Sequence, residues 1–569
     1  MHTNRDIESS AVKAAADTAT NGHLPHSNDH HNPSVPPFFA SLPPPDVNAL
    51  IERIGGGLAQ VIVLVLAGAI YFLDGAELFV FSIANRTHGD DQPWTLSAAG
   101  KGVMLSLVLG GYAIGGSCSG YVADFIGRRR PMFIAFSGLL LANILLYFAR
   151  TVPQLLVFAF FAGLSMGAGI PVWTTLCSEV SPISWRAPLQ GLGNTLLPVG
   201  SIYTICVIIF ADPEMRTLSW RHLIVMASIP ALVVLPLAAC FLTESPHYLA
   251  IKGRWDDVRR VLRRLAWLNG RRVDELDVHW EDDGRPGDNG AEGDIPAPSR
   301  SSFHVVFNDT YRYTTFVLCC VTFTCNMISY GLLYALPQVF VDIEKQTGIA
   351  PAYSLLRAEL MSLLGNALSV FADVGPRRVT QAASLLLECI AMGLTAAALV
   401  WDWATVAVWA AAMGKFCTFL GLNITFLYSA EIYPTVCRST GVSIAVSSGR
   451  IGGIIAPLLF ELTVWVATFL PAVDRYDGGR YCVFFGVLGV AAFVSAALLM
   501  TLPYETRGAR LQDDASSAGV KSDGSFHEDL CEGLLEKCDD SHHICLRVPR
   551  EGHTHGEKDE LRSERLLGS

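Results

Sequence analysis

Charged residues are scarce in this chain. Asp, Glu, Lys and Arg make up 16% of its 569 residues, whereas about a quarter of a soluble protein is charged. Hydrophobic residues supply 51%, and many segments exceed the ~20 apolar residues that cross a bilayer as a helix. The sequence therefore predicts a polytopic, all-α membrane protein embedded in the lipid bilayer.

Several functional classes lack the residues that they need. The net charge of −11 says little about partners, because the acidic residues gather in the tails and the central loop, and nothing supports a nucleic-acid partner. The 14 cysteines mostly stand singly within apolar segments, so a disulfide framework is not expected. No Ser/His/Asp set, metal-ligand cluster or phosphate-binding loop occurs where water could reach it. We therefore expect no enzyme activity, no cofactor and no metal site.

The most informative pattern present is Glu-x-x-Pro-x-x-x-Arg, which occurs at 179–186 and again at 431–438. Each copy stands where an apolar stretch gives way to a polar loop. Upstream of each copy, another apolar stretch ends in an aspartate, a glycine and paired arginines. These residues are Asp124, Gly127, Arg128 and Arg129 in the first half and Asp373, Gly375, Arg377 and Arg378 in the second. The same signals in two halves predict an internal repeat, which in an apolar chain is typical of a transporter.

The apolar stretches predict twelve transmembrane helices in two halves of six. The first half holds 60–84, 102–123, 131–149, 153–178, 187–210 and 222–242, and the second holds 313–340, 354–373, 379–400, 404–431, 439–469 and 481–502. The chain then divides into a disordered cytosolic tail (1–55), a six-helix bundle (56–243), a cytosolic linker with a basic amphipathic helix (244–311), a second six-helix bundle (312–505) and a disordered cytosolic tail (506–569).

Basic residues are concentrated in alternate loops. These loops hold Arg128–Arg130, Arg186, Arg259–Arg264, Arg377–Arg378 and Arg438. Because Lys and Arg are retained on the cytosolic side, both termini are predicted to be cytosolic, in the plasma membrane or an endomembrane. Asn85 begins an Asn-Arg-Thr sequon on the predicted outer side and is a candidate glycosylation site.

Glycines recur at helical spacing in the second predicted span. They are Gly111, Gly115, Gly116 and Gly120. Small residues at this spacing let the backbones of membrane helices approach closely. We therefore expect this helix to pack tightly against a neighbour.

Several segments resemble the major facilitator superfamily. GYVADFIGRRR at 120–130 is similar to the family's signature loop between the second and third helices, and SVFADVGPRR at 369–378 to its weaker copy between the eighth and ninth. LTESPHYL at 242–249 and LPYETRGARL at 502–511 resemble the signatures that end the sixth and twelfth helices of sugar porters and their relatives. The resemblance covers about 60–510 and implies the major facilitator fold.

Three further stretches narrow this resemblance. FLDGAELFVFSI at 72–83, GKFCTFLGLNITFLYSAEIYPTVCRSTG at 414–441 and RIGGIIAPLL at 450–459 resemble the synaptic vesicle 2-related proteins and the organic cation/anion transporters. Phe125 and His247 stand where the motifs of the wider family usually have arginine. The second departure, together with the missing glutamines of sugar porters, argues against a hexose carrier.

Asp74 and Glu77 lie inside the first span, three residues apart and so on one helix face. A charged carboxylate near mid-bilayer costs roughly 2.5–3.5 kcal/mol on the scale derived from helix insertion. The residues and the resemblance together favour proton coupling, in which Asp74 takes up and releases a proton, with Glu77 as a second candidate. A structural contact to a neighbouring helix is the alternative for both.

Lys415 and Arg450 bring positive charge to a similar depth in the second half. Unpaired, each would be costly, so each should face the cavity or a carboxylate. The resemblance to organic-anion transporters implies that Arg450 occupies a position where that family carries an arginine. Two hypotheses stay open: the two cations bind the carboxylate or phosphate of a substrate, or they are neutralised within the protein, for example by Glu388.

Two further groups of candidates follow from position alone. Asn326, Tyr330 and Tyr71 lie within spans and are predicted to line the substrate cavity. The doubled motifs are predicted to form a cytosolic gate, closed by ion pairs across the seam between the halves and broken when the protein opens inward. The gate residues are Asp124, Arg128, Arg129, Glu179, Arg186, Asp373, Arg377, Arg378, Glu431 and Arg438.

The residues and the resemblance together predict a secondary-active, proton-coupled transporter of a small organic solute, with anionic or zwitterionic solutes favoured over sugars. Its partners would be that solute, protons and lipid. An organic cation carrier or a uniporter is the alternative within transport. A membrane receptor or vesicle component that does not transport is the alternative outside it.

Overall fold

The computed structural model describes residues 47–84, 98–271, 306–308, 311–369, 375–433, 438–469 and 479–502. The candidate glycosylation site Asn85 and the candidate gate residue Asp373 lie outside these ranges. Most of both predicted tails also lies outside them.

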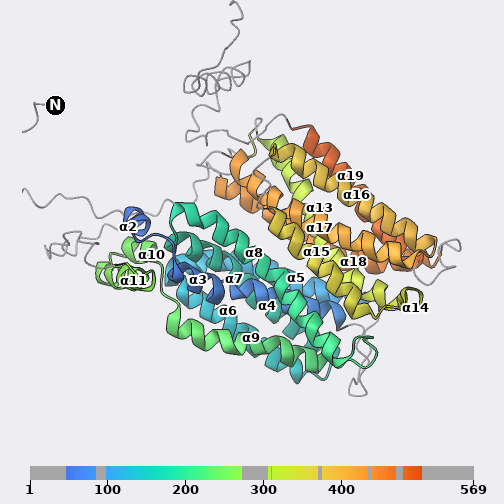
Figure 1. Cartoon of the computed structure of the whole chain (residues 1–569), viewed down its shortest axis with the longest axis horizontal. Helices are drawn as coiled ribbons and strands as arrows, with labels where there is room; N and C mark the ends of the chain where they lie inside the picture. The colour runs from blue at the N-terminus through green and yellow to red at the C-terminus, as the bar shows by residue number, and fades with distance from the viewer. Residues whose placement is uncertain are drawn as a thin grey trace, which may run out of the picture.

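The described chain is helical and forms two side-by-side halves (Figure 1). The N-terminal half contains α3 (Leu58–Leu66), α4 (Ala69–Ile83), α5 (Ala98–Ile126), α6 (Arg129–Tyr147), α7 (Val152–Val180), α8 (Ile183–Ala211) and α9 (Trp220–Phe241). The C-terminal half contains α13 (Arg312–Asp342), α15 (Pro351–Leu368), α16 (Arg377–Val400), α17 (Ala404–Ile432), α18 (Arg438–Ala467) and α19 (Cys482–Met500). The short elements α14 (Glu344–Thr347) and η4 (Gly479–Tyr481) lie in the same half.

The predicted spans match these helices to within a few residues. Among the described residues, 11 segments are long and apolar enough to cross a membrane, with α3 and α4 counted as one segment. The predicted span 354–373 is not among them. Its helix α15 has 18 residues, and Arg357 and Glu359 lower its hydropathy. It nevertheless packs within the C-terminal half like the other helices, so the fold has twelve spans in two halves of six.

Three short helices cover one end of the N-terminal half. They are α2 (Val47–Ile54), α10 (Pro246–Ile251) and α11 (Trp255–Leu268). The prediction that 1–55 is disordered is wrong for α2. This segment has an apolar helix face whose residues are buried: Val47, Leu50, Ile51 and Ile54. Burial of that face offsets the conformational entropy lost when the helix forms.

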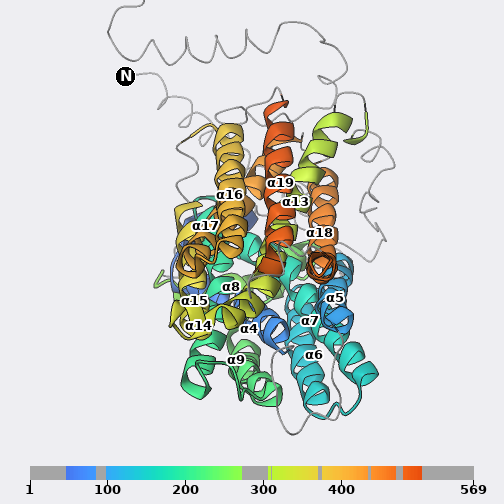
Figure 2. The same ribbon diagram turned by 90° about the vertical axis from the view of Figure 1, so that its right-hand side faces the viewer.

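Helix packing repeats the internal symmetry read from the sequence. In the N-terminal half α5 packs along α7 and α4 along α8, and in the C-terminal half α15 packs along α17 and α13 along α18. Between the halves, α5 packs on α18 and α8 on α15. Seen from the end, the C-terminal half lies above the N-terminal half (Figure 2).

Close backbone approach at glycines holds the paired helices together, as expected for α5. A Cβ on Gly111 would lie 2.2 Å from the carbonyl oxygen of Phe160 on α7, and one on Gly115 would lie 2.1 Å from that of Leu164. Gly365 makes the equivalent approach between α15 and α17, where a Cβ would lie 2.3 Å from the carbonyl oxygen of Phe416. Such contacts supply van der Waals packing where lipid gives no hydrophobic drive.

Gly111→Ala is therefore expected to destabilise the N-terminal half by about 1–3 kcal/mol, because the backbones of α5 and α7 must separate. A lower midpoint of thermal unfolding in detergent would register the loss. Gly110→Ala is the matched control, since no atom lies within 4 Å of a Cβ at that position. Equal losses in the two variants would contradict the close-packing explanation.

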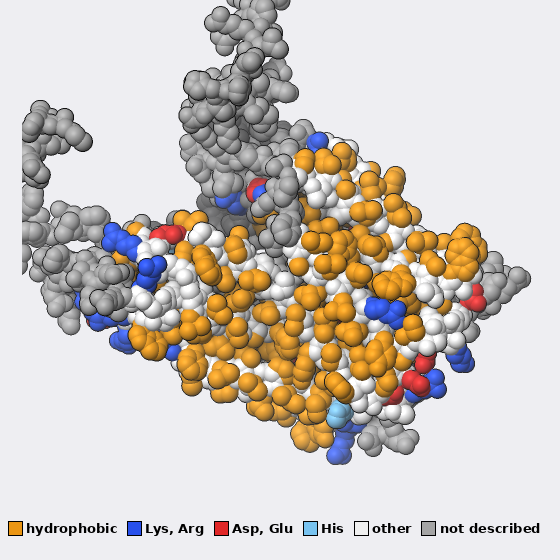
Figure 3. Space-filling view, in the orientation of Figure 1, with side chains coloured by type: hydrophobic (Ala, Val, Ile, Leu, Met, Phe, Trp, Pro, Cys, Tyr) orange, Lys and Arg blue, Asp and Glu red, His pale blue; other side chains and the backbone are white. Residues whose placement is uncertain are grey.

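The surface divides into an apolar band and a basic end. Hydrophobic side chains cover the middle of the face drawn in Figure 3, with Lys and Arg at both ends, accompanied by Asp and Glu at the end that holds α14. By residue, most of the arginines belong to the end that holds α10 and α11. We call this the basic end; it contains Arg128–Arg130, Arg254–Arg264, Arg377, Arg378 and Arg438. The opposite end contains α14 and the connection between α8 and α9. Membrane proteins show the same asymmetry, with more Lys and Arg in the loops on the cytosolic side than in those on the other side.

Candidate functional site

Asp74 is a buried carboxyl at the interface of the two halves. It is fully buried on α4, neither of its carboxylate oxygens has a hydrogen-bond partner within 3.5 Å among the described residues, and the hydroxyl of Tyr112 is the neighbouring donor. Tyr112 belongs to α5, and Tyr71 and Tyr330 lie within electrostatic reach. Burying a charge without a partner is costly, and proton uptake removes the charge. The environment of Asp74 therefore suits a group that binds a proton.

Arg450 reaches the same place from the other half. Its guanidinium Nη1 donates to the carbonyl oxygen of Ala113 at 3.2 Å, and its Cζ lies 5.7 Å from the centre of the Tyr112 ring. A Cβ on Gly116 would lie 2.7 Å from Arg450, so the glycine makes room for the guanidinium. No carboxylate of the described residues forms an ion pair with Arg450 within 4.0 Å.

Three tyrosines bring the acid and the cation into one cluster. Tyr71, Tyr112 and Tyr330 each lie within electrostatic reach of both Asp74 and Arg450. The structure thus brings together four residues that the sequence singled out, from α4, α13 and α18. Tyr112 was missed. Its position four residues before Gly116, on the glycine face of α5, was the signal that could have found it.

Asn326 lies beside this cluster on α13. Its Nδ2 donates to the carbonyl oxygen of Thr322 at 2.9 Å. A Cβ on Gly449 of α18 would lie 2.5 Å from Asn326 Nδ2. Its donor is therefore engaged within α13, against α18. Asn326 is half-buried, one turn from Tyr330.

Glu77 does not share a site with Asp74. It is fully buried, and one carboxylate oxygen accepts a hydrogen bond from Asn143 of α6 at 2.5 Å. The same Asn143 amide donates to Ser228 of α9 at 2.9 Å. Glu77 thus faces the interior of the N-terminal half, which favours the structural alternative for this residue.

Lys415 is neutralised within its own half. Its ammonium pairs with Glu359 of α15, and both side chains are almost completely buried. The partner suggested by the sequence, Glu388, instead accepts a hydrogen bond from Thr418. The prediction of Lys415 as a substrate-binding cation is therefore not supported, since its charge is already paired.

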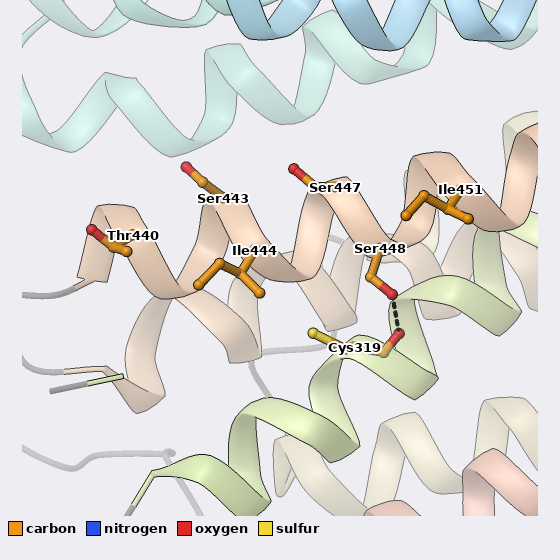
Figure 4. A pocket seen from close by; sticks show the side chains of 7 residues that line it. All are labelled: Cys319, Thr440, Ser443, Ile444, Ser447, Ser448 and Ile451. Atoms are coloured by element: carbon orange, nitrogen blue, oxygen red, sulfur yellow. Dashed lines mark hydrogen bonds between the residues drawn. The ribbon is translucent and has the colours of Figure 1, made fainter. Parts of the chain in front are cut away.

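A cleft leads from the basic end toward the cluster. It encloses ≈ 580 Å3 and is lined by Cys319 of α13 and by Thr440, Ser443, Ile444, Ser447, Ser448 and Ile451 of α18. Ser443 and Ser447 point away from α13 toward helices of the N-terminal half, and Ser448 donates to the carbonyl oxygen of Cys319 (Figure 4). Arg450 is the next helical turn after Ser447. Hydroxyl groups thus follow one face of α18 into the protein.

The seam is closed at the opposite end. The contacts there join Arg216 to Glu344 at 3.4 Å, the backbone N–H of Ala352 to the carbonyl oxygen of Pro213 at 3.3 Å, and Ser106 to the carbonyl oxygen of Ile454 at 2.7 Å. Midway, Asn194 of α8 donates to Asn423 of α17 at 3.2 Å. The cleft lined by Thr440, Ser443 and Ser447 lies at the basic end. The conformation is therefore open toward the basic end.

The candidate gate residues form ion pairs within each half, and the expected pairs across the seam are absent between the described residues. Arg128 binds Glu179 at 3.2 Å and Asp124 at 3.0 Å in the N-terminal half. Arg377 pairs with Glu431 in the C-terminal half. This conformation is open at the basic end. Ion pairs between the two halves there would therefore form only in another conformation.

The arginines of the doubled motif have the same role in both halves. Arg186 donates from Nε to the carbonyl oxygen of Ser181 at 3.1 Å, and Arg438 donates from Nε to that of Tyr433 at 3.3 Å. In each case the acceptor lies five residues back, so the two arginines make equivalent hydrogen bonds. The paired arginines also cap helices: Arg129 donates to the carbonyl oxygen of Ala239, and Arg378 to that of Leu502.

The loop after α8 is built around Asp212, outside the spans. Its carboxylate accepts hydrogen bonds from the backbone N–H groups of Glu214, Arg216 and Thr217. Burial acts to raise the pKa of Asp212, but the hydrogen bonds from Thr217, Arg216 and Glu214 outweigh it and lower the pKa. This turn presents Pro213 to the other half.

The ionised carboxylate therefore stabilises this loop above the ordinary Asp pKa of about 3.9, and the effect is lost as the pH falls through the lowered value. Asp212→Ala is expected to speed hydrogen exchange at the amides of Arg216 and Thr217 at neutral pH by more than tenfold. Glu214→Ala, which leaves the Asp212 turn in place, is the control. Unchanged exchange in Asp212→Ala would show that the turn is held by other contacts.

Comparisons with known proteins agree with this architecture. A sequence profile described as "Sugar (and other) transporter" matches residues 53–513. The chain is 25% identical to organic cation/carnitine transporter 7 of Arabidopsis thaliana over 507 residues, which cover 83% of this chain and 97% of that protein. It is 29% identical to solute carrier family 22 member 6 of Bos taurus, covering 72% and 68%, and 25% identical to the synaptic vesicle 2-related protein of Rattus norvegicus, covering 85% of each.

Solved structures agree on the fold. The inward open conformation of the xylose transporter XylE from E. coli superposes with a TM-score of 0.60 at 17% identity, covering 80% of this chain and 98% of that one. At this identity the likeness concerns the arrangement of helices alone.

Proposed function

Because the chain belongs to the sugar (and other) transporter family of the major facilitator superfamily, we propose that it is a secondary-active, proton-coupled carrier of a small organic solute with an anionic group. The observation that carries this proposal is the meeting of Asp74 and Arg450, one from each half, at the seam. A site with residues from both halves changes its geometry whenever the halves move relative to each other. Alternating access requires such a change, because the site must be exposed first to one side of the membrane and then to the other.

Arg450 is the candidate anion-binding residue. Its guanidinium has no carboxylate partner among the described residues and retains donors beyond the one given to Ala113. Arg450 follows Ser447, which lines the cleft, by about one helical turn. Guanidinium groups bind carboxylate and phosphate through paired hydrogen bonds. Tyr71, Tyr112 and Tyr330 offer aromatic surface and hydroxyl groups for the rest of the solute.

Asp74 is the candidate proton carrier. In the conformation open to the basic end its carboxyl is fully buried and has no hydrogen-bond partner within 3.5 Å among the described residues, a setting that favours the neutral acid. Opening to the other side would admit water and release the proton. Proton binding and solute binding would then be coupled through the tyrosines that lie between Asp74 and Arg450.

The basic end is proposed to face the cytosol, with both termini on that side. The support is the concentration of arginine at this end, in loops of both halves. The displayed conformation would then be open to the cytosol, and the contacts of Arg216, Ala352 and Ser106 would form the closed outer gate.

A ligand panel tests this proposal. Thermal unfolding of the purified protein is measured with monocarboxylates, betaine, tetraethylammonium and hexoses, because a ligand of the folded state raises its apparent stability. Carboxylate-bearing compounds are expected to raise the unfolding midpoint of the wild type. They should also raise that of the control variant Arg357→Gln, because Arg357 lies over the ring of Trp409 and not in the cluster. They should have no effect on Arg450→Gln.

A shift with tetraethylammonium that Arg450→Gln retains and Asp74→Asn loses would overturn the anion assignment. It would favour the organic cation carrier, for which the buried Asp74 would be the binding charge. A shift with hexoses alone would contradict both.

A further inference from the structure

Arginines from two helices converge on the end of α9 at the basic end. Arg129, at the start of α6, donates from Nη2 to the carbonyl oxygen of Ala239 at 2.7 Å. Arg264, on α11, donates from Nη2 to the carbonyl oxygen of Cys240 at 2.9 Å. These acceptors are adjacent carbonyl groups in the last turn of α9, where a helix leaves its carbonyl groups without partners in its own backbone. The two guanidinium groups are thus held at one turn.

No carboxylate in the described part of the chain neutralises this positive charge. Among the described residues no carboxylate forms an ion pair with Arg129, Arg264 or their exposed neighbours Arg130 and Arg263. Two acidic side chains nearby are engaged elsewhere. Glu244 accepts from the backbone N–H groups of Arg128 and Arg129, and Asp257 pairs with Arg254 and Arg260.

Capping of α9 explains only part of this arrangement. A guanidinium has five N–H donors, and Arg129 and Arg264 each give one to a carbonyl group. The Nε of Arg129 is buried without a partner. Arg263 contacts no acceptor among the described residues, so capping gives no reason for its placement.

Apolar groups exposed beside the arginines complete the surface. Leu237 and Phe241 of α9 are 42% and 48% exposed, and Trp267 at the end of α11 is 72% exposed. The apolar face of α11 is already used, because Val258, Leu262 and Leu265 are buried against the bundle. Trp267 therefore lies outside the protein core, and an exposed tryptophan near the end of a span is the kind of residue enriched between the acyl chains and headgroups of a bilayer.

We propose that this corner of α6, α9 and α11 is a binding site for an anionic phospholipid. The headgroup phosphate would accept hydrogen bonds from Arg263 and Arg264 and from the free donors of Arg129, and the acyl chains would lie along Leu237 and Phe241. Basic pockets between membrane helices on the cytosolic side recognise anionic headgroups in this way. The site lies on the outer surface of the N-terminal half, so the inference does not depend on which solute is carried.

Trp267 supplies a probe at the site. The full-length protein is placed in nanodiscs of phosphatidylcholine that contain a small fraction of phosphatidylglycerol, with brominated chains on one lipid or the other. The fluorescence of Trp267 is obtained by subtracting the tryptophan fluorescence of Trp267→Phe from that of the wild type. Brominated phosphatidylglycerol is expected to quench this signal at several-fold lower mole fraction than brominated phosphatidylcholine.

Arg263→Gln/Arg264→Gln is the test variant. Each arginine near an anionic lipid surface contributes about a factor of five in affinity, so the double variant should bind phosphatidylglycerol about 25-fold more weakly. Arg150→Gln, an exposed arginine at the opposite end, should leave the preference intact. An unfolding midpoint in pure phosphatidylcholine that matches the wild type excludes misfolding as the cause.

Two results would overturn the inference. One is an undiminished preference for phosphatidylglycerol in the double variant. The other is full protection from quenching by glycerophosphoglycerol, the headgroup without chains, at equal concentration, which would identify a site for soluble anions.

Discussion

Asp74→Asn is expected to abolish uphill accumulation of the solute while leaving its exchange across the membrane. Asparagine keeps the size and polarity of the side chain but cannot take up and release a proton. In proteoliposomes with an imposed pH gradient, the variant should fill only to the outside concentration, whereas the wild type should exceed it. Exchange of labelled against unlabelled solute needs no net proton movement and should persist in the variant.

Glu77→Gln is the matched control for this result. Its carboxyl is equally buried on the same helix but is bound by Asn143 inside the N-terminal half. Accumulation by Glu77→Gln should stay near that of the wild type. If Glu77→Gln loses accumulation and Asp74→Asn retains it, the assignment of the proton carrier to Asp74 is wrong.

Lys415→Met is expected to destabilise the protein by about 3–5 kcal/mol, because it leaves Glu359 as a buried charge without its partner. The double variant Lys415→Met/Glu359→Met should regain most of this loss, since replacing both partners removes both buried charges. Unfolding midpoints of the two single variants and the double variant, measured in the same detergent, give the coupling energy.

Transport by the double variant separates the two hypotheses for Lys415. The structure favours a paired, structural lysine, so a folded double variant should still carry the solute. Loss of solute binding in a double variant that has regained its stability would restore Lys415 as a substrate contact.

The fold was predictable from the sequence because hydropathy and length fix spans in a membrane protein. Eleven of the twelve predicted spans meet those criteria, and the remaining helix, α15, falls short because it carries Arg357 and Glu359. The carboxylate of that helix is also the partner of Lys415. Glu359 thus both weakens the hydropathy signal of α15 and neutralises the charge of Lys415.

The contacts within the site were less predictable. The sequence placed Asp74, Arg450 and Tyr330 at suitable depths, but depth does not say which way a helix is turned. Rotation is set by packing at small residues. Gly75, for example, brings α4 so close to α8 that a Cβ there would lie 1.9 Å from the carbonyl oxygen of Leu197. Glu77 is consequently directed into the half and Asp74 toward the seam.

The gate illustrates the same limit. Two copies of one motif predicted two equivalent helix ends, and in both the arginine, Arg186 or Arg438, donates to the carbonyl oxygen five residues before it. The sequence could not say whether the glutamates pair within or across the halves, because that depends on which way the carrier is open. The ion pairs of this conformation lie within each half.

Proton movement during solute entry tests the central claim most directly. Proteoliposomes containing the wild-type protein and an internal pH-sensitive dye are mixed with a carboxylate ligand from the thermal panel, with no pH gradient imposed. Solute entry should acidify the interior at a rate that follows uptake, and Asp74→Asn should give no acidification. Uptake by the wild type without internal acidification would contradict proton-coupled transport through Asp74.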